Sequence, residues 1–176
     1  YIGTLGSQLA SSANDGDFRF NFFFVKDNQI NAFALPGGYI GVNAGLLLAT
    51  DSENELAGVL AHEVSHVTQR HIARAMYDNQ RTSIMSMATM LAALLLGAAS
   101  DMPGDAMTGV VTASQAMAAQ RQINFTRSNE HEADRVGMEV LSSAGFDPSG
   151  MSSFFEKLSK RYGSQQQYVP AILQTH

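Results

Sequence analysis

The sequence predicts an α+β domain that is mainly helical, with a small antiparallel sheet beside its central helix. Aromatic-rich, partly alternating segments separated by turn signals indicate strands in the first quarter of the chain. After residue 50, a helix-capping pattern and helical signals indicate that most of the remainder is helix. The chain has 176 residues and no internal repeat or low-complexity linker. We therefore expect a single domain over residues 1–176.

Three short strands are expected before residue 43. Residues 18–25 are rich in phenylalanine and begin with alternation, which indicates a first strand. After an Asp-Asn turn, residues 29–35 form a second strand that ends at a Pro-Gly-Gly sequence. Residues 39–42 form the third strand. We expect the three to pair as a small antiparallel sheet.

Helix boundaries follow from capping patterns. Ser52 is followed three residues later by Glu55, a capping box that opens a helix expected to run through residue 66. Further along, Gly145 marks the end of one helix, and Asp147 before Pro148 marks the capped start of the next. The chain after residue 50 is therefore expected to be a helical body that packs on the sheet.

The segment Ile84–Ala99 is the most apolar part of the chain and is rich in Met, Ala and Leu. It is shorter than the roughly 20 residues that a helix needs to span a bilayer. We expect a buried helix or a helical hairpin. The alternative is contact with a membrane or with a partner protein, because Met and Ala suit an adaptable surface.

Composition excludes some classes of function. The formal net charge is −5, and no stretch gathers Lys and Arg on one face, so no nucleic-acid partner is expected. The chain has no cysteine, which excludes thiol catalysis, thiolate metal ligands and disulfides. The chain begins at Tyr1 without a signal-peptide pattern, as expected of a processed or trimmed segment.

Residues 62–66 read His-Glu-Val-Ser-His, a pattern by which one helical turn can hold a catalytic zinc ion. At a spacing of i and i+4, His62 and His66 project from one helical face and can offer two imidazole nitrogens to one metal. Glu63 then lies beside the ion, where it can act on water instead of binding the metal. The alternative interpretation is an amphipathic helix that carries two polar histidines.

A catalytic zinc site needs a third protein ligand and one open position. An extended pattern with Gly at 69 and His at 72 is excluded, since the chain has Gln69 and Ile72. Downstream, Glu130 and Asp134 are four residues apart and share a helical face, whereas Glu132 points elsewhere. We therefore choose Glu130 as the third ligand and Asp134 as the group that orients a ligand histidine. An ordinary solvated acidic face is the alternative.

These motifs resemble the HtpX and BepA type of zinc metallopeptidases, a gluzincin family that also includes the CAAX prenyl proteases. The resemblance covers nearly the whole chain and is carried by residues 31–38, 61–66 and 129–137. Residues 67–71, Val-Thr-Gln-Arg-His, are most similar to the bacterial BepA branch. The resemblance implies one Zn²⁺ per chain, Glu130 as the zinc-binding glutamate and Asp134 as its paired aspartate.

The same resemblance implies a location and a setting. Members of the BepA branch act in the periplasm of Gram-negative bacteria, in quality control of outer-membrane proteins. A tetratricopeptide-repeat domain usually follows their protease domain, and any such domain would lie outside the 176 residues of this chain. Contact with a membrane or with outer-membrane assembly machinery is expected through Ile84–Ala99.

The chain has three further histidines, at positions 71, 131 and 176. By resemblance, His176 matches a histidine that can fold back onto the metal as a fourth ligand and so keep the enzyme latent; the alternative is a terminal residue without a fixed place. His71 is five residues past His66, and helical geometry turns it well off the metal face. For His71 and His131 we expect positions at the surface or behind the ligands.

The predicted reaction is hydrolysis of a peptide bond with Glu63 as the general base. By resemblance, the second strand borders the cleft, and a substrate can pair with it at Asn31, Ala32, Phe33 and Ala34. Backbone pairing suits an unfolded or misassembled polypeptide. The alternative is a chaperone-like binding module with a mainly structural zinc, although a structural site has no need of Glu63.

Overall fold

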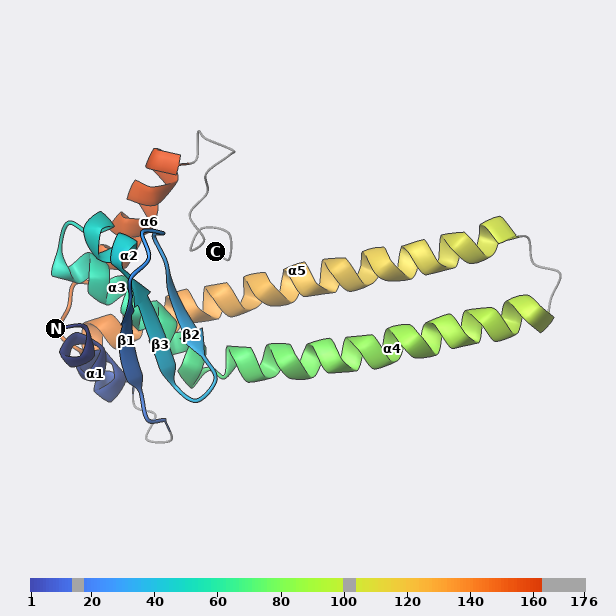
Figure 1. Ribbon diagram of the computed structural model, residues 1–176, viewed down its shortest axis with the longest axis horizontal. Helices are drawn as coiled ribbons and strands as arrows, with labels where there is room; N and C mark the ends of the chain where they lie inside the picture. Colours follow the sequence, from blue (N-terminus) through green and yellow to red (C-terminus); the bar gives the residue numbers. More distant parts are fainter. Residues whose placement is uncertain (14–17, 100–103, 163–176) are drawn as a thin grey trace. The chain divides into compact units, whose positions relative to one another are not determined.

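The computed structural model describes residues 1–13, 18–99 and 104–162. The chain divides into two compact units, one formed by Tyr1–Ile72 with the chain from Asn129 onward and the other by Ala73–Ser128. The first unit holds the sheet and most of the shorter helices (Figure 1). The predicted class, a mainly helical α+β protein with a small sheet, is confirmed.

The sheet has three strands, β1 (Asn21–Val25), β2 (Ala32–Leu35) and β3 (Tyr39–Asn43), in the order β1-β3-β2. β2 and β3 form an antiparallel hairpin. Gly37 and Gly38 adopt positive φ angles and so allow the tight turn between these strands. β1, however, pairs with β3 in parallel. The prediction of a wholly antiparallel sheet is therefore wrong.

The chain between β1 and β2 explains this parallel pairing. It does not form a tight hairpin, because the Asp27 carbonyl accepts a hydrogen bond from the Gly45 N–H at 2.9 Å. Gly45 lies in the first turn of α2 (Ala44–Ala49). The connection is thus held at the end of β3, and the chain crosses to the far side of β3 before β2 begins.

Helix α3 (Glu53–Thr68) is the centre of the first unit, and almost all of its residues are buried. It packs against α1 (Ile2–Ser12), β2 and α6 (Ser149–Tyr162). Its start is the one predicted, since the Ser52 hydroxyl accepts a hydrogen bond from the Glu55 N–H at 3.2 Å. The Glu55 carboxylate accepts from the Asp51 N–H at 2.8 Å and pairs with Lys157 of α6 at 2.6 Å.

Two glycines let neighbouring helices approach α3 closely. A Cβ atom on Gly58 would lie only 2.7 Å from the Met151 Cα of α6. A Cβ atom on Gly137, in the last part of α5 (Gly104–Ser143), would lie 3.3 Å from the His62 Cα. α5 and α6 are joined as predicted, with Gly145 at φ 84° and the Asp147 carboxylate accepting from the Ser149 N–H.

The second unit consists of parts of α4 (His71–Ala99) and α5, which together line a groove of about 570 Å³. The predicted helix at residues 84–99 is confirmed, but its predicted burial is wrong: Ile84, Met87 and Leu95 are 61%, 65% and 71% exposed. Among the described residues this unit contains only these two helical segments, which are too few to enclose an apolar face. Within the same residues, no helix has both the length and the hydrophobicity needed to cross a bilayer.

Candidate metal centre

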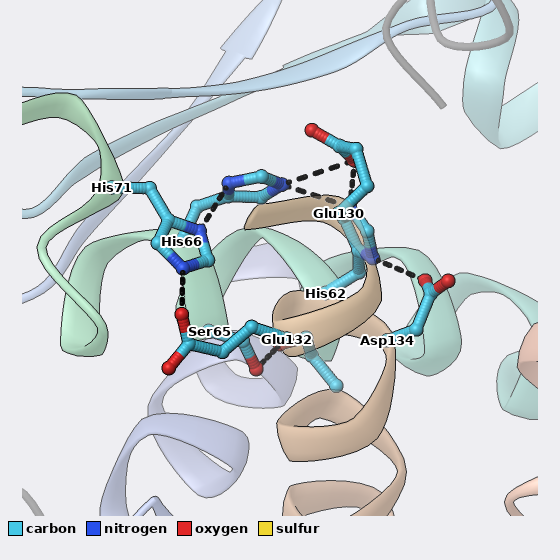
Figure 2. A network of polar contacts seen from close by, with 8 residues as sticks. His62, Ser65, His66, His71, Glu130, Glu132 and Asp134 are labelled. Atoms are coloured by element: carbon cyan, nitrogen blue, oxygen red, sulfur yellow. Dashed lines mark hydrogen bonds and ion pairs between the residues drawn. The ribbon is translucent and has the colours of Figure 1, made fainter. Parts of the chain in front are cut away.

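Helices α3 and α5 bring three potential ligands together (Figure 2). His62 and His66 lie one turn apart on α3, and their Nε2 atoms are 2.9 Å apart. The Oε2 atom of Glu130, from α5, lies 3.4 Å from the His62 Nε2 and 3.6 Å from the His66 Nε2. The three side chains chosen from the sequence thus converge on one point.

The spacing of these donors fits a tetrahedral zinc ion. Bonds of 2.0–2.2 Å at tetrahedral angles separate neighbouring ligand atoms by about 3.4 Å. The donor separations of 2.9, 3.4 and 3.6 Å surround this value. Two neutral nitrogens and one carboxylate oxygen are also the donor set of known catalytic zinc sites, in which a fourth position serves water and substrate.

The electrostatics at His62 favour a positive charge. Its side chain is fully buried, and its Nδ1 lies 2.9 Å from Oδ1 of Asp134. Burial lowers the pKa of His62, but hydrogen bonds to Asp134 and Glu130 and the nearby charge of Glu63 outweigh it and raise the pKa to about 9. A cation at this point would therefore be attracted by several carboxylates at once.

Glu63 follows His62 on α3 and is 5% exposed. Among the described residues, no side chain or backbone group donates a hydrogen bond to its carboxylate. Its oxygens are therefore available to a water molecule or a substrate. Its catalytic role stays a prediction, which the geometry permits.

Of the two positions expected for His71, at the surface or behind the ligands, the structure shows the second, and its partner there is His66. The His66 Nδ1 lies 2.9 Å from the Nδ1 of His71, and the His71 Nε2 lies 3.1 Å from the Glu132 carboxylate (Figure 2). His71 is 3% exposed, so it is not a surface residue. The helix ends at Thr68, and Arg70 adopts a φ of 57° before α4 begins at His71, so residue 71 does not continue the spacing of α3. A non-glycine residue with positive φ leaves no clear signal in the sequence.

The other predicted residues lie outside the metal centre or beyond the described part of the chain. His176 lies outside the described residues. The proposed substrate segment, Asn31–Ala34, lies at and within β2, which is an edge strand and packs against α3. His131 is exposed on α5, as expected.

Two histidines one turn apart, a glutamate between them and a second glutamate from another helix define a metallopeptidase domain. Comparison with known proteins agrees. The model of peptidase family M48 matches residues 1–176. The chain belongs to peptidase family M48, and its resemblance to the HtpX and BepA type of metallopeptidases is confirmed.

Relatives of this chain include larger proteases. It is 46% identical over 180 residues to the beta-barrel assembly-enhancing protease of Yersinia pestis, and 45% identical over 179 residues to that of Escherichia coli K12. Each match covers 100% of this chain and 35% of the relative, so the chain spans about a third of their length. It is also 29% identical over 160 residues to the metalloprotease LoiP of Escherichia coli, a match that covers 90% of this chain and 58% of LoiP.

Asp134 is expected to set the affinity of this site for zinc. Asp134→Ala removes the carboxylate that fixes the orientation and tautomer of His62, and the dissociation constant for Zn²⁺ should rise by about 10- to 100-fold. Competition with a chromogenic chelator measures it. Glu139→Ala, which removes an exposed carboxylate of the same helix, is the control. Equal affinities in both variants and the parent would exclude this role of Asp134.

Proposed function

We propose that this chain is the catalytic domain of a zinc-dependent endopeptidase that hydrolyses peptide bonds of unfolded or misassembled proteins. The observation that carries the proposal is the convergence of His62, His66 and Glu130 on one point, with Glu63 buried beside them. A binding module with a structural zinc would not need Glu63.

The setting of the activity is proposed on family grounds. Two relatives are named for enhancing beta-barrel assembly, and the family resemblance implies protein quality control in the periplasm of a Gram-negative bacterium. Membership of peptidase family M48 supports a polypeptide substrate. Contact with a membrane or with outer-membrane assembly machinery is proposed through Ile84–Ala99, where large apolar side chains are exposed.

The mechanism assigns a task to each side chain. A zinc ion held by His62, His66 and Glu130 supplies Lewis-acid activation of water and of the substrate carbonyl. The Glu63 carboxylate accepts the proton of the attacking water and later gives it to the nitrogen of the leaving amine. Asp134 accepts a hydrogen bond from the His62 Nδ1–H, so that the Nε2 lone pair faces the site.

An extended substrate can be bound by β2. The Asn31 carbonyl accepts from the Asn43 N–H, and residues of an antiparallel strand alternate in the direction of their backbone groups. With Ala34 opposite Ile40, Ala32 and Ala34 therefore direct their N–H and C=O groups to the outer edge. Because β2 has no described strand on that side, these groups can pair with a substrate backbone.

Glu63→Gln tests the enzymatic proposal. The variant should keep its zinc, because Glu63 is not a ligand, and lose about 10²- to 10⁴-fold in kcat because the general base is gone. Zinc content by atomic absorption and hydrolysis of casein, with and without chelator, measure the two effects. Glu139→Gln is the control.

Near-parental hydrolysis by Glu63→Gln would remove Glu63 from the mechanism. A parent protein that binds zinc but cleaves no unfolded substrate would favour the chaperone-like module.

Ala34→Pro tests substrate binding at the edge of β2. Proline removes an N–H that faces outward, so the sheet keeps its own hydrogen bonds. Loss of one hydrogen bond to the substrate should lower kcat/KM by about three- to tenfold. Ala34→Val keeps the N–H and is the matched control. Equal kcat/KM for both variants, at equal zinc content, would exclude pairing at this position.

The latch proposed for His176 rests on family resemblance alone. If His176 closes the open position, His176→Ala should raise the rate of casein hydrolysis above that of the parent. A rate no higher than that of the parent would show that His176 does not restrain the enzyme.

A further inference from the structure

The second ligand histidine has an unusual support. In many zinc sites, the ligand imidazole donates its other N–H directly to a carboxylate or a carbonyl oxygen. His62 follows this rule through Asp134, but His66 contacts the imidazole of His71 instead (Figure 2). The carboxylate of Glu132 stands one step further away, at the opposite nitrogen of His71.

We infer that His71 is a positioning residue that transmits the orienting effect of Glu132 to His66. The inference rests on the proposed zinc site. If the His66 Nε2 lone pair faces the ion, the hydrogen of His66 is on Nδ1. This N–H donates to the His71 Nδ1, 2.9 Å away, which must then be an acceptor.

The remaining proton is then assigned as well. His71 carries its hydrogen on Nε2, which donates to the Glu132 carboxylate at 3.1 Å. The ionised Glu132 carboxylate can only accept hydrogen bonds, so it fixes the direction of both hydrogen bonds in the series. The result is an ordered series, Glu132 to His71 to His66, in which each group sets the tautomer of the next.

The backbone holds this series in place. Arg70, with φ 57°, turns the chain between the end of α3 and the start of α4 at His71. Its N–H donates to the Val67 carbonyl at 2.9 Å, which closes the turn. Residues held in such a sparsely populated conformation are concentrated at functional sites, where the surrounding structure enforces them. Here the turn places the His71 ring edge-on to the His66 ring, with centroids 4.9 Å apart.

Burial makes the series effective. The side chains of His71 and His66 are 4% and 15% exposed, and that of Glu132 is 31% exposed. Water competes poorly for hydrogen bonds in such surroundings. The two ligand histidines thus have unequal supports, since His62 is held by a carboxylate directly and His66 by a carboxylate through a second imidazole.

The test begins with three substitutions in the purified protein. His71→Phe keeps a buried ring but offers no acceptor to His66. His71→Gln keeps both functions, because an amide oxygen can accept from His66 while the amide nitrogen donates to Glu132. His131→Phe replaces an exposed histidine and is the control. Binding of Zn²⁺ is measured by chelator competition, and the visible spectrum of the Co²⁺-loaded protein reports the ligand geometry.

We expect His71→Phe to raise the dissociation constant for Zn²⁺ by about 10- to 100-fold and to change the Co²⁺ spectrum. His71→Gln and His131→Phe should stay near the parent in both measurements. Glu132→Ala should weaken binding in the parent but add nothing in the His71→Phe background, because its effect on His66 passes through His71.

Parental affinity and spectrum in His71→Phe would overturn the inference. Equal losses in His71→Phe and His71→Gln, together with a lower melting temperature of the metal-free protein, would also overturn it, because they would show a packing role. His62→Ala tests the proposed zinc site itself, on which the role of His71 depends. If that variant binds zinc as tightly as the parent, the proposed zinc site itself is wrong, and the role of His71 falls with it.

Discussion

The close packing of α5 on α3 is the constraint on which the site depends. The proposed ligands come from two helices, and Glu130 follows His66 by more than sixty residues in sequence, yet a metal site tolerates errors of only about 0.2 Å in ligand distance. At Gly137 a Cβ atom would lie 3.3 Å from the His62 Cα, tighter than ordinary van der Waals contact, so the absence of a side chain there lets the two helices approach closely. Two turns earlier on α5, Glu130 then reaches the imidazoles. α6 also packs on α3, through the still closer approach at Gly58.

Electrostatics link this packing to a cation. Glu63, Glu130 and Asp134 surround His62, which is fully buried, and the raised pKa of His62 records their combined attraction for positive charge. Carboxylates gathered in a partly buried place are costly unless a positive charge compensates them. A divalent ion offers that compensation while leaving the imidazoles neutral. Folding of the first unit and binding of the ion are therefore expected to support one another.

The sequence predicted the features that depend on local geometry. The spacing of His62 and His66, and that of Glu130 and Asp134, follow from the helical repeat, and the cap at Ser52 depends on neighbouring residues only. The failures concern longer distances. The direction of β1 depends on where the following loop is docked, at Gly45. The exposure of residues 84–99 depends on whether another element covers them, which an apolar composition cannot reveal.

His71 shows the limit of helical extrapolation most clearly. The spacing argument excluded it as a ligand but could not show which ring it contacts, because it assumed one uninterrupted helix through residue 71, whereas α3 ends at Thr68 and Arg70 adopts a positive φ before α4 begins. The same segment of α5 then serves two purposes. Glu130 faces the proposed metal position, and Glu132, two residues on and therefore on another face, meets His71. One short piece of α5, fixed by its packing on α3, thus supplies both the proposed ligand Glu130 and, through His71, the support of His66. A displacement of α5 would consequently disturb the proposed coordination and its outer support together, which couples the geometry of the site to a single helix contact.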